Sequence, residues 1–164
     1  MRPRSGTRRR AVALALVAGV LLAGCATPPA PAPAAWSGRL ALTLATEPPQ
    51  RWSASFELDG TPAQGVLRLY TPLGQTVATI RWDGAGAWLD RGAAPPRRYD
   101  SLEILTADLT GAPLPVAALF AWLGGTAQDV PGWEVDLTEQ PQGRLRARRA
   151  APPPAADLRL LWQP

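Results

Sequence analysis

The sequence predicts a single antiparallel β-sheet with helices packed on one of its faces. Over residues 36–90, and again over 133–162, apolar residues recur at every second position, which is typical of strands with one buried and one solvated face. Residues 100–125 change to a helical spacing. The order of strands, helices and strands favours one sheet with the helices on a single side.

The predicted strands are separated by turn residues. Asp59-Gly60 and Asp83-Gly84 are typical hairpin dipeptides, because both central positions of a type I′ turn need positive φ. Residues 88–89 predict a further strand that ends before Gly92, and the prolines at 152–154 predict a loop near the C-terminus. The alternating apolar positions are Leu40, Leu42, Leu44, Trp52, Ala54, Phe56, Leu58, Leu67, Leu69, Ala78, Ile80, Trp82, Trp133, Val135, Leu137, Leu145, Ala147, Leu158, Leu160 and Trp162.

Two short helices are predicted in the middle of the chain, joined by a proline elbow at residues 109–115. Asp100 is the expected cap of the first helix, with Glu103 three residues later as in a capping box, and Gly111 is the expected stop. Pro115 suits the first turn of the second helix, which ends at residues 124–125. The apolar stripes are Leu102, Leu105 and Leu109 in the first helix, and Val116, Leu119, Phe120 and Leu123 in the second.

The N-terminus predicts a lipoprotein signal peptide over residues 1–24. Five arginines precede an apolar run of about a dozen residues, and Leu22-Ala23-Gly24-Cys25 then ends the segment with small residues before a cysteine. Cys25 is the only cysteine in the chain, so an internal disulfide is excluded and Cys25 is the expected lipid-attachment site. Residues 25–35 then predict a proline- and alanine-rich tether, and residues 36–164 the folded domain. By the sorting rule for lipoproteins in general, Ala26 after the cysteine favours the outer membrane.

The net positive charge of the full chain comes from the predicted signal peptide and does not indicate an acidic partner for the mature protein. All 17 basic residues are arginines and five of them lie in the signal peptide, so the mature chain has 12 arginines against 13 acidic residues and a net charge of −1. A basic footprint for nucleic acid is therefore absent from the mature protein.

The residue types left in the mature chain argue against catalysis. The chain has no histidine, its only cysteine is expected to carry lipid, and it contains no phosphate-binding glycine loop. We therefore expect no catalytic residues, no metal and no cofactor. Acidic residues acting as a hydrolase pair are the weaker alternative, because they are scattered over polar strand positions and turns. Seven tryptophans leave two possibilities open, a filled core or an apolar concavity that binds a greasy ligand.

Two segments within residues 66–125 form a distinctive combination, namely VLRLYTPLGQTVATIRWDG and RRYDSLEILTADLTGAPLPVAALFAWLGG. They contain a strand–turn–strand unit, a helix, the LTG-x-P-x-P elbow and a second helix ending in WLGG. Through these motifs the chain resembles the LolB family of outer-membrane lipoprotein receptors. Residues 36–40 and 158–161 resemble the first and last strands of the family. The family's N-terminal helix before the first strand has no counterpart here, and arginines crowd residues 144–149, so a smaller cavity is expected.

The resemblance implies an open antiparallel half-barrel with the two helices plugging its concave face. It implies a monomeric, non-enzymatic receptor, lipid-anchored in the outer membrane and facing the periplasm. Such a receptor accepts acylated lipoproteins from the periplasmic carrier LolA in an apolar cavity and inserts them into the membrane. The residues expected to line that cavity are Leu40, Leu42, Trp52, Phe56, Leu67, Leu69, Ile80, Trp82, Leu105, Leu109, Leu119 and Leu123.

The resemblance also implies a membrane-insertion loop at Pro72, Leu73 and Gly74, with Leu73 as its exposed leucine. A turn tip between two strands offers a leucine no core to join, although a leucine folded back under its own loop is the alternative. For the protein as a whole, the alternative is an envelope lipoprotein that holds another lipid or a partner protein in the same concavity.

Overall fold

The computed structural model describes residues 36–163 and contains one antiparallel sheet and two α-helices. The predicted signal peptide, Cys25 and the predicted tether lie outside the described residues. The helices are α2, Leu102–Thr110, and α3, Val116–Leu123, and a short 3-10 turn, η2, spans Gln140–Gln142. The strands are β1 Trp36–Leu44, β2 Gln50–Gly60, β3 Gly65–Tyr70, β4 Thr76–Asp83, β5 Gly86–Asp90, β6 Arg97–Tyr99, β7 Trp133–Asp136, β8 Arg144–Arg149 and β9 Ala156–Trp162.

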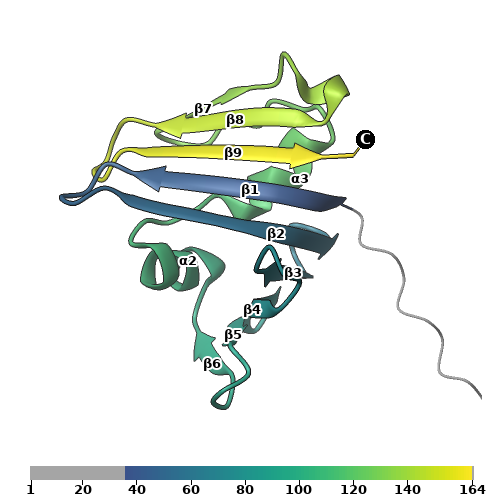
Figure 1. Ribbon diagram of the computed structural model, residues 1–164, viewed down its shortest axis with the longest axis vertical. Coiled ribbons are helices and arrows are strands. Elements are labelled where there is room, and N and C mark those ends of the chain that lie inside the picture. The colour runs from purple at the N-terminus through teal and green to yellow at the C-terminus, as the bar shows by residue number, and fades with distance from the viewer. Residues whose placement is uncertain (1–35, 164) are drawn as a thin grey trace, which may run out of the picture. The chain divides into compact units, whose positions relative to one another are not determined.

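The nine strands form one sheet that is not closed into a barrel. Their order is β6-β5-β4-β3-β2-β1-β9-β8-β7, so β1 pairs with both β2 and the C-terminal β9. Strands β6 and β7 are the two ends of the sheet, and within residues 36–163 they do not pair with each other. In Figure 1, β1, β8 and β9 run across the view while β3 to β5 are turned nearly end-on, so the sheet bends strongly. The open half-barrel with two helices is confirmed.

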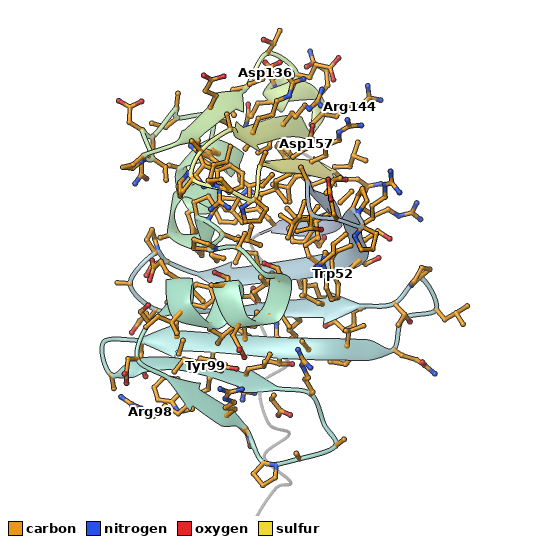
Figure 2. All side chains as sticks on the ribbon, turned by 90° about the vertical axis from the view of Figure 1, so that its left-hand side faces the viewer. Trp52, Arg98, Tyr99, Asp136, Arg144 and Asp157 are labelled. Carbon is orange, nitrogen blue, oxygen red and sulfur yellow. The ribbon has the colours of Figure 1, made fainter. Side chains whose placement is uncertain are left out.

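The period-two pattern of the sequence corresponds to the two faces of this sheet. Leu42 and Leu44 of β1, Phe56 and Leu58 of β2 and Ile80 of β4 are at most 2% exposed and belong to one core. Arginine and acidic side chains occupy many of the positions between the inward-facing residues, on the outer face. In Figure 2 the outer residues Asp136, Arg144 and Asp157 lie at the β7–β9 end of the sheet, whereas Arg98 and Tyr99 of β6 lie at the other end.

The turns and one strand differ from the sequence predictions. Asp59 and Gly60 are the last residues of β2, and a loop over residues 61–64 follows them. The β4–β5 hairpin turns at residues 84–85, where Gly84 does not have positive φ and the Asp83 carboxylate accepts a hydrogen bond from the Ala85 amide at 2.7 Å. An aspartate side chain that bonds the backbone two residues on thus replaces the expected type I′ geometry. Strand β6 was not predicted, since three residues carry no alternation and only pairing with β5 defines them.

The first helix begins one residue later than the sequence predicts. Ser101 is the N-cap, and its hydroxyl accepts a hydrogen bond from the Ile104 amide at 3.2 Å. Asp100 forms an ion pair with Arg98 instead, at 3.2 Å. The expected capping box with Glu103 is therefore wrong, because the shift places Ile104 at the third helical position. Gly111 ends the helix in the left-handed conformation, with φ 83°, as predicted.

This cap assignment makes a direct prediction about stability. Ser101→Ala should lower the free energy of unfolding by about 1 kcal/mol, because it leaves a helical amide without its acceptor. Asp100→Ala is the matched control and should change the free energy of unfolding by less than about 0.5 kcal/mol, since its exposed ion pair contributes little. Urea unfolding followed by circular dichroism measures both. A larger loss for Asp100→Ala than for Ser101→Ala would contradict the assignment.

Candidate functional site

The concave face of the sheet is the candidate binding surface, and the two helices cover it. Eight of the twelve residues predicted to line a cavity are buried there, three are partly buried against the core, and Trp52 is 45% exposed. The buried eight are Leu42, Phe56, Leu67, Ile80, Trp82, Leu105, Leu119 and Leu123, and the partly buried three are Leu40, Leu69 and Leu109. The structure thus brings eleven of them together in one apolar layer between sheet and helices.

Helix α3 occupies the centre of this layer. Its sequence VAALFAWL is apolar all round, which is typical of a helix with neighbours on every side. The Phe120 ring makes edge contacts with Trp36 and Trp82, at centroid distances of 5.6 Å and 6.1 Å. The contacts of α3 with the sheet are therefore apolar and aromatic, and an alkyl chain could replace them without leaving a charge unpaired.

Trp122 anchors the opposite side of α3 and was not among the predicted site residues. It is fully buried, its indole N–H donates to the Gln128 carbonyl at 2.9 Å, and its ring lies 6.5 Å from that of Trp133. Of the seven tryptophans, Trp82, Trp122 and Trp162 are buried, whereas Trp36, Trp88 and Trp133 are partly buried. Three tryptophans are therefore part of the filled core, three are only partly covered, and Trp52 alone is exposed.

Two threonines hold the elbow between the helices. The Thr106 hydroxyl accepts from the Leu114 amide at 3.0 Å, and the Thr110 hydroxyl lies 2.8 Å from the Thr106 carbonyl and 2.9 Å from the Ala112 carbonyl. Both threonines are buried. The sequence contained a signal for them, namely two threonines four residues apart on the apolar side of a helix. Pro113 and Pro115 lack amides, so the hydroxyls satisfy the backbone groups that remain.

Arg149 ties this elbow to the sheet. Its guanidinium donates to the Pro113 carbonyl at 3.2 Å and to the Pro154 carbonyl at 2.9 Å, and it lies 5.6 Å from the Trp133 ring. The residue is 3% exposed, its Nε has no hydrogen-bond partner, and no carboxylate of residues 36–163 pairs with it. Burial lowers the pKa of the Arg149 guanidinium. A cation held only by neutral groups is a weak restraint, because its desolvation offsets much of what its hydrogen bonds contribute.

The turn between β3 and β4 presents the predicted loop residues. Leu73 is 89% exposed, so it is not folded back under the turn. Gly74 has φ 80°, its amide donates to the Thr71 carbonyl at 2.9 Å, and the Thr71 amide donates to the Gln75 carbonyl at 2.8 Å. Pro72 is exposed beside them. The turn is therefore braced by its own hydrogen bonds and holds one leucine in solvent.

A cluster of ion pairs around Asp157 lies on the outer face of the sheet. Asp157 on the outer face accepts hydrogen bonds from Arg146 and from Arg159, the latter at 3.1 Å. Burial raises the pKa of Asp157, but the hydrogen bonds from the two arginines outweigh it and hold that pKa below its usual range.

Residues 36–163 contain no group of three or more acidic, histidine or cysteine side chains placed to bind a metal. No helix in that range is long and apolar enough to cross a bilayer.

Comparison with known proteins gives one consistent result. The family model described as Outer membrane lipoprotein LolB matches residues 34–151. The outer-membrane lipoprotein LolB of Cupriavidus pinatubonensis is 38% identical over 79 residues, which are 48% of this chain and 37% of the relative. Its namesake in Alkalilimnicola ehrlichii is 33% identical over 156 residues, covering 84% of this chain and 76% of the relative. That of Azoarcus sp. is 30% identical over 173 residues, covering 89% and 86%. The chain thus spans little more than a third of the first relative and most of the other two.

Arg149 allows a prediction that separates stability from mobility. Arg149→Met should change the free energy of unfolding by less than about 1 kcal/mol, because losing two hydrogen bonds is offset by removing a buried unpaired cation. The elbow should nonetheless open more readily, so amide hydrogen exchange at Leu114 should accelerate about fivefold, the equivalent of one hydrogen bond. Exchange measured by mass spectrometry on the variant and the parent tests this. Unchanged exchange at the elbow would show that Arg149 does not restrain it.

Proposed function

The chain belongs to the family of outer membrane lipoprotein LolB, and we propose that it acts as an outer-membrane receptor that accepts acylated lipoproteins and inserts them into the membrane. In this proposal Cys25 carries the lipid anchor and the folded domain faces the periplasm. The donor is a periplasmic carrier of the LolA type, and no catalytic step is involved.

The observation that carries the proposal is the apolar layer beneath α3. Each methylene group kept out of water contributes about 0.8 kcal/mol, so one long acyl chain needs roughly 10 kcal/mol of shelter to pass through the periplasm. Nine of the eleven apolar residues between sheet and helices lie outside α3 and offer such shelter once that helix moves aside, whereas Leu119 and Leu123 move with it. Because α3 contacts the sheet through Phe120 and leucines, acyl chains would replace these apolar contacts with other apolar contacts.

The contacts that hold the elbow are compatible with a movement of α3. Thr106, Thr110 and Arg149 connect it to neighbouring groups by hydrogen bonds, and Arg149 does so without a counter-ion among residues 36–163. Helix α3 has no side-chain cap at Pro115 that would have to be broken. The sequence contains no phosphate-binding loop, so transfer would run downhill, from carrier to this concave face and from there to the bilayer.

Leu73 supplies the proposed release step. A leucine held 89% exposed by a hydrogen-bonded turn has no partner in the described part of the domain, and burial in a bilayer would remove its apolar surface from water. Insertion at this point would bring the receptor's cargo next to the membrane that receives it.

Leu73→Glu tests this function. A carboxylate in the bilayer costs of the order of 2–3 kcal/mol, so the inserted population should fall about a hundredfold, while uptake of lipoprotein from the carrier stays intact. The measurement follows a labelled lipoprotein from carrier to receptor to outer-membrane vesicles. Leu161→Glu is the matched control, because Leu161 is 49% exposed on β9 and should tolerate the charge. Normal release by the Leu73 variant would refute the role of the loop.

A further inference from the structure

Exposed apolar side chains gather at one corner of the sheet. Within residues 36–163 five large hydrophobic side chains are exposed, and three of them lie around the end of β3: Trp52 at 45%, Leu73 at 89% and Val77 at 47%. The other two, Ile104 and Leu161, lie on α2 and β9. A concentration of apolar surface of this kind marks an interaction site more often than scattered single residues do.

The strand register places Trp52 at the same edge of the sheet as the turn. Tyr70, the last residue of β3, pairs with Ser55 of β2. Trp52 precedes Ser55 by three residues in β2, and Leu73 follows Tyr70 by three residues, so in these antiparallel neighbours both lie on the same side of the Ser55–Tyr70 pair. Adjacent strands are about 4.8 Å apart, so Trp52 and Leu73 both lie past the end of β3, on neighbouring segments of the chain.

Trp52 is exposed because β3, on one side of β2, ends before it. It pairs with Leu42 of β1, which is 2% exposed, but β3 does not continue alongside residues 50–54. Its indole therefore has core on one side and solvent on the other. Trp52 was predicted as a cavity-lining residue, and its half-exposed position also suits a side chain with one apolar and one wet surface. Such an environment is that of a membrane interface, where tryptophan is enriched.

An exposed arginine lies beside Trp52 at this corner. Arg51 precedes Trp52 in β2, with its side chain on the other face of the strand, and it forms no ion pair with any residue of 36–163. Farther along β2, Glu57 accepts a hydrogen bond from the Tyr70 hydroxyl and Asp59 accepts one from Arg68, each at 2.7 Å. Both acidic groups of β2 are therefore engaged in hydrogen bonds, while Arg51 is available to a lipid phosphate.

We infer that Trp52, Leu73, Val77 and Arg51 form one membrane-contact surface, in which Leu73 enters the acyl layer, Trp52 lies at the interface and Arg51 meets the phosphates of anionic lipids. This inference rests on the proposed function, since it takes the bilayer as the partner of Leu73. A single leucine fixes one point of contact, whereas four side chains on β2, the turn and β4 fix an orientation. The corner would thereby hold the concave face at a set angle to the bilayer during release.

Fluorescence quenching tests this surface on the mature lipidated chain reconstituted in vesicles of phosphatidylethanolamine and phosphatidylglycerol. The lipid anchor keeps every variant on the membrane, so the readout is depth and not binding. Some acyl chains carry bromine near the carbonyl end, which quenches tryptophans at the interface. The emission of Trp52 is the difference between the parent and Trp52→Phe, and it should be blue-shifted and lose most of its intensity in the brominated vesicles.

Two further variants make the outcome decisive. Trp88→Phe is the matched control, because Trp88 is partly buried and pairs with Arg81 and Arg98 away from the corner, so its component should not be quenched. Leu73→Trp reports on the turn itself. Quenching both of Trp52 and of the indole introduced at position 73 supports the surface. Quenching at position 73 without quenching of Trp52 overturns the inference and leaves the release loop standing, whereas no quenching at either position overturns the inference together with the role of the loop.

Discussion

The contact between α3 and the bent sheet is the interaction on which the rest of this structure depends. An open sheet with a leucine- and tryptophan-lined concave face cannot leave that face in water, and helix α3 covers it through Phe120 against Trp36 and Trp82. The same contact closes the surface on which we propose that acyl chains bind. Core and candidate site are therefore one set of residues, and on this proposal the protein alternates between packing them on its own helix and offering them to a lipid.

This double use fits the finding that, among residues 36–163, the polar contacts of α3 and of the elbow are hydrogen bonds without an ion pair. A salt bridge across the elbow would fix the helix, whereas threonine hydroxyls and an unpaired guanidinium hold it with bonds of modest strength. The strongly connected charges are elsewhere. Asp157 binds Arg146 and Arg159 on the outer face of β8 and β9, where rigidity does not hinder the movement of the helices. On this account the sheet is the rigid part of the molecule, and the elbow with α3 is the part that yields.

The sequence predicted those features that depend on local pattern. Alternation in β1, β2 and β4 identified the inner face, Gly111 identified the end of α2, and the position of Leu73 between Pro72 and Gly74 identified an exposed leucine. Features that depend on distant partners were missed. Strand β6 exists only through its pairing with β5, Arg149 acquires its role from Pro113, which is 36 residues away, and the exposure of Trp52 follows from where β3 stops. The N-cap was misplaced by one residue because Asp100 and Ser101 are both good caps, and the ion pair with Arg98 engages the first of them.

The central claim is that acyl chains take the place of α3 on the concave face, and a photo-crosslinker on the sheet at Phe56 tests it most directly. Benzoylphenylalanine has the shape of an extended phenylalanine and suits this position, because Phe56 of β2 is 2% exposed and stays on the concave face when α3 moves aside. After incubation with a carrier loaded with radiolabelled acyl lipoprotein, illumination should attach the label to the receptor at this position, and the same crosslinker at Leu161 on the outer face should capture none. Crosslinks from position 56 only to the protein's own helices, under conditions in which lipoprotein is transferred, would contradict the account.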